Sequence, residues 1–427
     1  MKILILDEEF PYPLNSGKRA RSFNLNSRLA KKHEVRWLAW GDPDSEACRY
    51  FASVGIHPIA VKRKSPPRSG AGFYLRLLWN LFQADPYIVT SHFGSAMQRC
   101  LEQQLQEFAP DVVLCEWSPY SYYLRGIISC PVVVVAHNVE ARIWQRYFQH
   151  ETNPLKRWYI GQQARKVQQF ESRMLGSISG LTTVTEEERE FFSRLDPSLP
   201  IRVIDNGVDL DYFRSASVPL KTTELVFAAS MDWRPNQDAA MHLVQSIFPR
   251  IKAEVPNATL TLVGRNPPPH IRALAQVAGV TVTGTVDDVR PYLDRAAVCV
   301  VPIRIGGGSR LKILDALAMS KAVVSTHVGA EGLHVRHGEN IALADSDAEF
   351  SAAVVSLIHD PHQARSLGMA GRARVEERYG WDILAQRLSA FLSLVVGEHA
   401  KPALHTVLAS PVAPQARVKR SLSSRCR

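Results

Sequence analysis

Short apolar segments alternate with amphipathic ones along most of this chain. Segments with the composition of buried strands lie at 2–6, 34–40, 111–115, 131–136, 181–184, 201–204, 224–229, 258–263, 280–283, 297–302 and 321–325. Between them are segments with helical spacing, the clearest at 156–175, 236–253, 269–278, 309–319 and 361–378. A further helix is expected after Thr185, which opens a capping box. This alternation predicts parallel sheets with helices on both faces.

The alternation stops and restarts near Asn206-Gly207, and 427 residues are more than one hydrophobic core usually holds. We therefore predict an α/β fold with two doubly wound, Rossmann-like domains, one at 1–205 and the other at 206–380. Ligands of open parallel sheets bind beyond the carboxyl ends of the strands. Both domains should therefore turn their strand-to-helix loops toward a shared cleft.

The segment 300–332 carries the most specific chemical signal. An apolar strand runs into a glycine loop and a helix start that together hold the groups of an anion site, namely Gly307, Gly308, Ser309, Arg310 and Lys312. Glycines let the backbone approach a ligand, and the unpaired N–H groups of a helix start attract anions. Asp315, about one turn further, suits sugar or ribose hydroxyls. Taken alone, these residues would also fit an ordinary strand-loop-helix connection.

Polar residues also follow the strands of the first half. They are Ser16 and Gly17, with the basic Lys18, Arg19 and Arg21, then Glu116, and finally His137, Asn138 and Glu140. The first loop suits a phosphate or a sugar, although an ordinary turn explains it as well. A histidine and a glutamate at one strand end indicate a catalytic or binding role, whereas a single histidine there is more often structural. In the second half, Arg234 is a further candidate partner for phosphate.

Composition and charge narrow the choice of function. No apolar run approaches the ~20 residues of a membrane span, and the six cysteines are scattered, which is typical of reduced thiols in a cytoplasmic protein. Much of the net charge of +10 falls in the last 27 residues, which contain six basic residues and no acidic one. We expect 398–427 to be a basic, disordered tail, solvated or in contact with anionic lipid or nucleic acid. Dinucleotide and P-loop motifs are absent, and the acidic pairs suggest no metal site.

Four segments together resemble a known family, the retaining nucleotide-sugar glycosyltransferases of family four, which have the GT-B fold. They are His137 to Glu140, Asn206 to Phe213, Met231 to Asn236 and Gly306 to Leu317. The last is similar to a glycine-rich sub-branch that often serves envelope polysaccharide synthesis. The resemblance implies an acceptor-binding first domain, a nucleotide-sugar-binding second domain, and a helix at 381–397 that returns to the first. The nucleotide-sugar is then a substrate, and no cofactor, metal or nucleic acid is expected.

The same resemblance assigns roles to individual residues. It implies catalytic roles for His137, Arg310 and Lys312, donor contacts for Ser16, Gly17, Arg234, Gly307, Gly308, Ser309 and Asp315, and acceptor-side roles for Glu116, Asn138 and Glu140. The chain departs from the family pattern at two glutamate positions, where it has Gly307 and Asp315. Ser230 stands near the position of a phosphate-binding arginine. Two alternatives stay open, a nucleotide-sugar 2-epimerase and a non-catalytic protein that binds sugar nucleotides.

One segment of the first half suggests a membrane surface as a further partner. Residues 72–82 are rich in aromatic and aliphatic side chains at helical spacing, and Lys62, Arg63, Lys64 and Arg68 precede them. A basic segment beside such a helix is typical of proteins that bind anionic bilayers. This would suit an enzyme with a glycan or lipid-linked acceptor on the inner face of the cell membrane. The alternative is a core helix whose apolar stripe packs on the first sheet.

Overall fold

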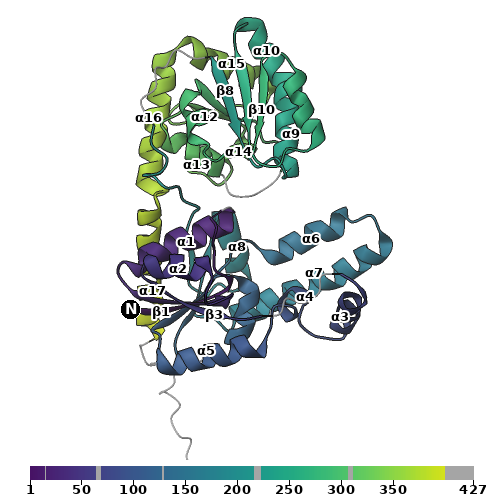
Figure 1. Ribbon diagram of the computed structural model, residues 1–427, viewed down its shortest axis with the longest axis vertical. Helices are drawn as coiled ribbons and strands as arrows, with labels where there is room; N and C mark the ends of the chain where they lie inside the picture. Colours follow the sequence, from purple (N-terminus) through teal and green to yellow (C-terminus); the bar gives the residue numbers. More distant parts are fainter. Residues whose placement is uncertain (15, 64–68, 127–128, 216–222, 306–310, 400–427) are drawn as a thin grey trace, which may run out of the picture.

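The fold is described from a computed structural model, in which residues 1–14, 16–63, 69–126, 129–215, 223–305 and 311–399 are placed. Two domains lie one above the other, and the last helix, α17 (Trp381–His399), runs beside the lower, N-terminal one (Figure 1). Of the tail predicted at 398–427, residues 400–427 lie outside the described part.

Each domain is built on one parallel sheet. The first has the order β3-β2-β1-β4-β5-β6-β7, with β1 (Lys2–Glu9), β2 (Glu34–Trp40), β3 (Ile56–Val61), β4 (Val112–Cys115), β5 (Val132–Val135), β6 (Gly180–Thr183) and β7 (Ile201–Val203). The second has the order β10-β9-β8-β11-β12-β13, with β8 (Glu224–Ala228), β9 (Thr259–Val263), β10 (Val280–Gly284), β11 (Val298–Val301), β12 (Val323–Ser325) and β13 (Ala342–Leu343). The predicted pair of doubly wound sheets is confirmed. Strand order reverses beside β1 and again beside β8, where such sheets bind ligands.

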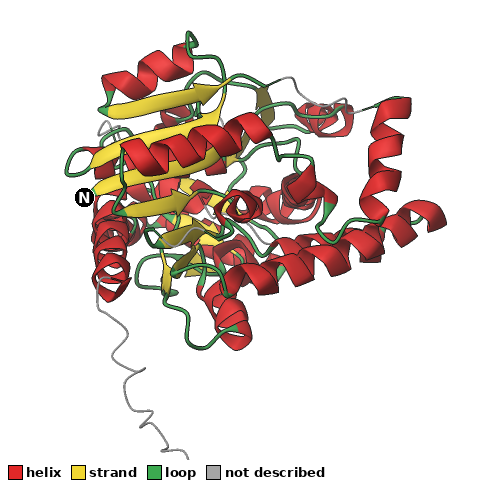
Figure 2. Ribbon diagram, turned by 90° about the horizontal axis from the view of Figure 1, so that it is seen from below, coloured by secondary structure: helices red, strands yellow, loops and turns green. Residues whose placement is uncertain are grey.

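Helices cover both faces of the sheets (Figure 2). In the first half they are α1 (Gly17–Ala30), α2 (Glu46–Ser53), α3 (Ala71–Leu81), α4 (Tyr87–Thr90), α5 (Ser95–Glu107), the 3₁₀ helix η1 (Ser118–Leu124), α6 (Glu140–His150), α7 (Pro154–Leu175) and α8 (Glu186–Leu195). In the second they are α9 (Arg234–His242), the π-helix η2 (Leu243–Ile247), α10 (Phe248–Glu254), α11 (Pro269–Arg272), the 3₁₀ helix η3 (Ala273–Gln276), α12 (Arg290–Arg295), α13 (Leu311–Ala318), α14 (His327–Ala330), α15 (Asp347–His359) and α16 (Pro361–Arg378).

Helix α17 belongs to the core of the first domain although it follows the second in sequence. Its buried side chains, among them Leu388 and Phe391, join the cluster formed around Ile3, Ile5 and Trp37. The packing is close at Gly180 on β6, where a larger residue would not fit easily. A Cβ there would lie 3.0–3.1 Å from side-chain atoms of Val395 and Phe391. Because this contact is apolar and buried, it attaches the end of the chain firmly to the first sheet.

The structure differs from the predicted elements in several places. The helix predicted at 269–278, for example, is α11 followed by the 3₁₀ helix η3. Strand β3 was not predicted, since it lies at the sheet edge, is mostly half-buried and contains Pro58. The two-residue strand β13 was also missed. The single helix predicted at 236–253 is instead α9, η2 and α10, with Pro249 at the start of α10, where a proline removes an i→i−4 hydrogen bond. The expected capping box at Thr185 is confirmed on α8.

Candidate functional site

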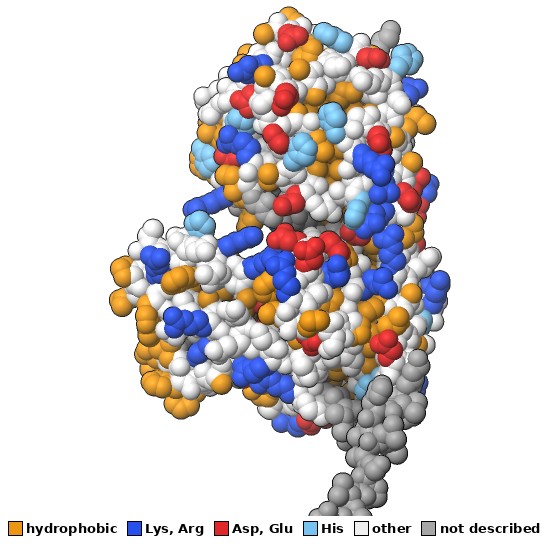
Figure 3. All heavy atoms as spheres, turned by 180° about the vertical axis from the view of Figure 1, so that it is seen from behind, with side chains coloured by type: hydrophobic (Ala, Val, Ile, Leu, Met, Phe, Trp, Pro, Cys, Tyr) orange, Lys and Arg blue, Asp and Glu red, His pale blue; other side chains and the backbone are white. Residues whose placement is uncertain are grey.

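A cavity of about 210 Å³ lies between the two domains. The first domain contributes Gly17, Lys18, Arg21, His137, Asn138, Val184, Thr185 and Glu188, the connection contributes Asp205 and Asn206, and the second domain contributes Leu314, Glu331, Gly332, Leu333 and Tyr379. The molecule is hollowed between its domains, with basic side chains at the edge of the hollow (Figure 3). The strand-to-helix loops of the two domains therefore meet at one cleft, as the sequence predicts.

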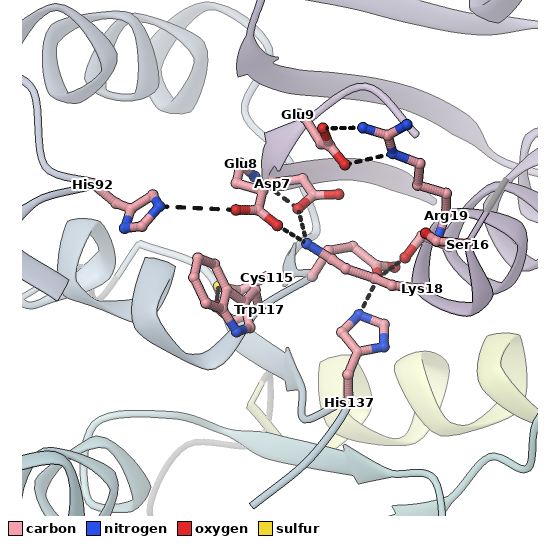
Figure 4. A network of polar contacts seen from close by, with 12 residues as sticks. Asp7, Glu8, Glu9, Ser16, Lys18, Arg19, His92, Cys115, Trp117 and His137 are labelled. Atoms are coloured by element: carbon pink, nitrogen blue, oxygen red, sulfur yellow. Dashed lines mark hydrogen bonds and ion pairs between the residues drawn. The ribbon is translucent and has the colours of Figure 1, made fainter. Parts of the chain in front are cut away.

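The start of α1 forms one wall of this cavity. Ser16 is its N-cap and accepts a hydrogen bond from the backbone N–H of Arg19. Lys18 Nζ lies 3.1 Å from Asp7 Oδ1 and 2.6 Å from Glu8 Oε1 (Figure 4). Burial opposes the charge of Lys18, but the two carboxylates outweigh it and raise its pKa. Burial also raises the pKa of Asp7 to about 7, despite the neighbouring ammonium group.

The other two basic residues in the first turns of α1, Arg19 and Arg21, also bind protein groups. Arg19 makes two hydrogen bonds of 2.7 Å to the carboxylate of Glu9. Arg21 is buried and donates to the carbonyl oxygens of Ile204 and Asp205, at 2.7 and 2.6 Å, where the first domain ends. These contacts hold the cations in the fold, while Gly17, Lys18 and Arg21 also line the cavity.

Glu116, which is buried, and His137, whose side chain is 9% exposed, form a pair at the ends of β4 and β5. His137 Nε2 lies 3.2 Å from Glu116 Oε2, and Ser22 and Asn26 on α1 donate to the two carboxylate oxygens at 2.7 and 2.6 Å. Burial alone would raise the pKa of Glu116, but His137 and these hydrogen bonds outweigh it and hold the pKa at about 2. Burial lowers the pKa of His137, although Glu116 opposes the shift, so the site favours the neutral imidazole. A carboxylate beside Nε2 favours the tautomer with its proton there.

The start of α6 lies next to this pair. Asn138 is exposed at the cavity, whereas Glu140 is buried and accepts a hydrogen bond of 2.9 Å from Trp117 Nε1. Because Val139 cannot cap the helix, Glu171 on α7 accepts the N–H groups of Glu140 and Ala141. Of the three predicted acceptor-side residues, only Asn138 is thus exposed to the cavity. Glu116 and Glu140 are buried behind the cavity surface, whereas the prediction placed them in contact with the acceptor.

Helix α13 contributes the wall that faces His137 across the cavity. Leu314 lines the cavity, and Lys312, two residues earlier, donates from Nζ to Asn236 Oδ1 at 3.2 Å. Burial raises the pKa of Asp315 to about 7, with Lys312 opposing this shift. The predicted Gly307, Gly308, Ser309 and Arg310 lie outside the described residues.

A cation that the sequence did not suggest lies at the end of β9. Arg265 Nε donates to Ser230 Oγ at 2.7 Å and lies 3.4 Å from Asp232 Oδ2. Asn236, the partner of Lys312, donates to the carbonyl oxygen of Ser230, so the loop after β8 links both cations. The sequence offered one signal for Arg265, its position directly after an apolar strand and Gly264. Nothing in the sequence indicated its contact with Ser230, which lies 35 residues earlier.

Gly264 explains how close the two loops lie. A Cβ at this position would be 1.7 Å from the carbonyl oxygen of Ala229, which no side chain could tolerate. The strand ends of β8 and β9 therefore touch through their backbones, and Met231 N donates to the carbonyl oxygen of Arg265 at 3.0 Å. This contact positions Arg265 beside Ser230.

Arg234 lies apart from the interdomain cavity. It lines a separate, open cavity of about 450 Å³ together with His242, His270 and Arg304. Arg304 is paired there with Asp238 at 2.7 Å. Arg234 is thus near the start of α9 as expected, but the structure does not bring it to the cavity that holds His137. Glu331, which the sequence analysis did not single out, does line that cavity.

Two features are absent from the part of the chain that the structure describes. In this part of the chain, no group of three or more histidine, cysteine, aspartate and glutamate residues could hold a metal ion. None of its helices is both long and apolar enough to cross a membrane.

Comparisons with known protein families match most of the chain to glycosyltransferases. The family model described as "Glycosyltransferase Family 4" matches residues 21–212, and the model described as "Glycosyl transferases group 1" matches residues 222–360. The two matches meet near the connection between the two sheets, so each domain has its own counterpart.

Three relatives are similar in sequence. A glycogen synthase of Mycobacterium tuberculosis is 23% identical over 90% of this chain and 92% of its own. An uncharacterised 44.6 kDa protein in the cps region of Klebsiella pneumoniae is 20% identical over 88% of this chain and 96% of its own. A GDP-mannose-dependent α-(1-6)-phosphatidylinositol monomannoside mannosyltransferase of M. tuberculosis is 29% identical over 47% of this chain and 58% of its own.

Solved structures share the fold. A sucrose-phosphate synthase of Thermosynechococcus elongatus has a TM-score of 0.65 at 18% identity, over 93% of this chain and 100% of that one. An Anabaena protein crystallised with UDP has a TM-score of 0.62 at 15% identity, over 92% of this chain and 100% of that one. At this identity the likeness concerns the arrangement of two parallel-sheet domains around a cleft.

Proposed function

This chain belongs to the family-4 glycosyltransferases with the GT-B fold, and we propose that it moves a hexosyl or related residue from a nucleotide-sugar to a glycan or lipid-linked acceptor with retention of configuration. Nucleotide-sugar glycosyl transfer follows from the family. The observation that carries the finer proposal is the interdomain cavity, which is lined by His137 and Asn138 of the first domain and by Leu314 of α13 in the second.

The second domain is the proposed donor site. Breaking the bond between sugar and nucleoside diphosphate places negative charge on the distal phosphate, and fixed cations stabilise that charge where it develops. Lys312 and Arg310 are the proposed partners of the diphosphate, with Gly307, Gly308 and Ser309 offering backbone N–H groups. Arg265 is an additional candidate, because it shares the loop after β8 with Lys312 through Asn236. Asp315 is the proposed ribose contact.

The first domain is the proposed acceptor side. His137 orients the transferred sugar and the acceptor, and its neutral state suits a hydrogen-bonding role better than that of a general acid. Glu116 acts through His137 as a positioning residue, since its oxygens already accept from Ser22 and Asn26. Asn138 is the proposed direct contact. Ser16 and Gly17 stay donor-side candidates, because Gly17 lines the cavity.

We propose that the same groups allow transfer with retention and without a metal ion. The leaving phosphate takes the proton of the acceptor hydroxyl on the face where the new bond forms, so no protein nucleophile is needed. The cations named above neutralise the diphosphate. Arg234, with its separate cavity, would contact the donor only after a rearrangement of the loops around α9.

The acceptor and the cellular place belong to the proposal as well. One relative is a protein of a cps region, and another is named for an acceptor built on phosphatidylinositol. These names support an envelope polysaccharide or a lipid-linked glycan as the acceptor. We place the enzyme in the cytoplasm, peripherally bound to the inner face of the membrane that carries such acceptors.

A donor screen tests the proposal. Thermal shift with UDP-, GDP- and ADP-sugars should identify one nucleotide class, because ligands of the native state raise the melting temperature. With that donor and a glycan acceptor, nucleoside diphosphate should be released, and NMR of the product should show the donor's anomeric configuration. EDTA should not change the rate. Conversion of the sugar without acceptor would indicate a 2-epimerase, and binding without either reaction a non-catalytic protein.

A further inference from the structure

Helix α3 exposes an apolar face. The exposed fractions are 64% for Tyr74, 65% for Leu75, 57% for Leu78, 68% for Trp79 and 86% for Phe82. Residues four apart lie on one side of a helix, so these side chains form one continuous surface. Asn80 is the only residue of α3 that is buried. The alternative from the sequence, a stripe packed on the first sheet, is therefore wrong.

Helix α3 is anchored to α7 by hydrogen bonds at its carboxyl end. Lys166 on α7 donates to the carbonyl oxygens of Asn80 and Gln83, at 2.5 and 2.6 Å, at the end of α3. Gln163, also on α7, donates to Asn80 Oδ1 at 2.9 Å. A lysine at the carboxyl end of a helix complements the helix dipole. Helix α3 is thus held by its polar side, which leaves the apolar side uncovered.

The tip formed by α6 and α7 adds to this surface. Tyr147 is 58% exposed, and Leu155 and Trp158 at the start of α7 are 82% and 55% exposed. Helices α3, α6 and α7 project together from the side of the first domain (Figure 1). Hydrophobic side chains gather along the outer edge of this projection, with basic ones beside them (Figure 3). An exposed apolar region of this extent usually marks an interaction site.

The net charge of the projection is positive. Residues 62–84 contain five basic residues and no acidic one, and residues 140–175 contain seven basic residues and three acidic ones. Two of those acidic residues, Glu140 and Glu171, are buried. The exposed cations include Arg76, Arg146 and Lys156.

The cations differ from those that the sequence suggested. Lys62 lies 3.5 Å from Asp42 Oδ1, and Arg63 stacks over Trp40 and donates to the carbonyl oxygen of Ser91. Lys64 and Arg68 lie outside the described residues. The described charge that surrounds the apolar face therefore comes mostly from the helices themselves.

We propose that this arm face, made of Tyr74, Leu75, Leu78, Trp79, Phe82, Leu155 and Trp158, docks on an anionic lipid bilayer. The inference rests on the proposed function only for the lipid-linked acceptor that such docking would serve. Aromatic side chains with a polar atom suit the boundary between lipid and water, and each cation near the surface adds about 1 kcal/mol of attraction. A second copy of the chain would bring two basic surfaces together, which disfavours self-association through this face.

Vesicle sedimentation of the full chain tests the docking. The wild type should sediment with phosphatidylcholine–phosphatidylglycerol vesicles, less so at high salt, and should stay in solution with phosphatidylcholine alone. The variant Leu75→Ser/Trp79→Ser/Phe82→Ser and the variant Arg76→Glu/Lys156→Glu should each bind at least about tenfold more weakly. The matched controls Met369→Ser, at a residue 60% exposed, and Arg365→Glu lie on α16 of the second domain and should bind as the wild type does.

The remaining measurements separate the docking from the transferase activity. Release of nucleoside diphosphate with a water-soluble acceptor should be unchanged in both arm variants, because the arm face lies outside the cleft. Absent wild-type binding, equal binding to neutral vesicles, or full binding by either variant would overturn the proposal, whatever the activity. So would a wild-type dimer that Trp79→Ser dissociates, since the face would then join two protein chains.

Discussion

The two walls of the cleft hold their charged groups in different ways. On the first wall, Glu116 and Arg21 are buried and bonded to protein groups. On the second wall, by which we mean the strand ends and helix starts of the second domain, Arg265 is almost half exposed beside Asp232, and Lys312 is half-buried with Asn236 as one of its partners. A buried charge is stable only when it is paired, whereas a cation near water can exchange its contacts for those of a ligand. The first wall is therefore built to position groups, and the second to receive charge.

The largest effect should follow from breaking the first wall. Glu116→Ala leaves the buried donors of Ser22, Asn26 and His137 without their acceptor. At about 1–3 kcal/mol for each unsatisfied donor, we expect the free energy of unfolding to fall by ~3–5 kcal/mol. Glu116→Gln keeps the shape and part of the hydrogen bonding, so it should lose less. Urea unfolding at pH 7 measures both. If Glu116→Ala were as stable as the wild type, the first wall would not be the interlocked network described above.

The next largest effect should come from the second wall, where substitutions should slow the reaction without lowering stability. Lys312→Ala and Arg310→Ala should each raise the barrier to transfer by ~2–4 kcal/mol, as expected for the loss of a charge-assisted contact to the leaving phosphate. Their melting temperatures should match that of the wild type. The measurement is kcat/KM for the donor, with Arg365→Ala on α16 as a distant control. Near-normal turnover in both variants would remove them from the phosphate site.

Asp315 should have a smaller effect, on binding. If its carboxylate contacts the ribose, Asp315→Ala should weaken the affinity for nucleoside diphosphate by about 1.5–3 kcal/mol, which is the range for one hydrogen bond to a charged group. Asp315→Glu should keep or improve the affinity, because the family has glutamate at this position. Calorimetric titration of the free enzyme compares the three proteins. Equal affinity in Asp315→Ala would make Asp315 a structural residue.

The smallest effect should be a pH dependence of stability without ligand. Burial raises the pKa of Asp315 to about 7 in the folded state, from 3.8. The folded protein therefore binds this proton more tightly, and the wild type should lose stability as pH rises from about 4 to about 7. Asp315→Asn cannot ionise, so its melting temperature relative to the wild type should rise by roughly a few degrees between pH 5 and pH 8. A constant difference would mean that Asp315 titrates normally.

Most of the fold could be predicted because buried parallel strands have a clear sequence pattern. The pattern failed at β3, an edge strand with Pro58, and at β13, which is only two residues long. For the candidate site, strand ends were a reliable guide to His137 and Asn138, which do reach the interdomain cavity. Arg234 follows a strand as well, yet it lines another cavity, since position after a strand does not decide the direction of a side chain.

The amino-acid sequence by itself determined the alternation of elements, the two sheets and the chemical types of residue at their ends, because these depend on local periodicity. Only the tertiary structure decided that Ser22 and Asn26 hold Glu116, and that Arg265 lies beside Ser230. It also decided that the apolar face of α3 is left uncovered. Periodicity shows that a helix has an apolar face or a strand a polar end, but which group packs against it depends on contacts between residues far apart in the chain.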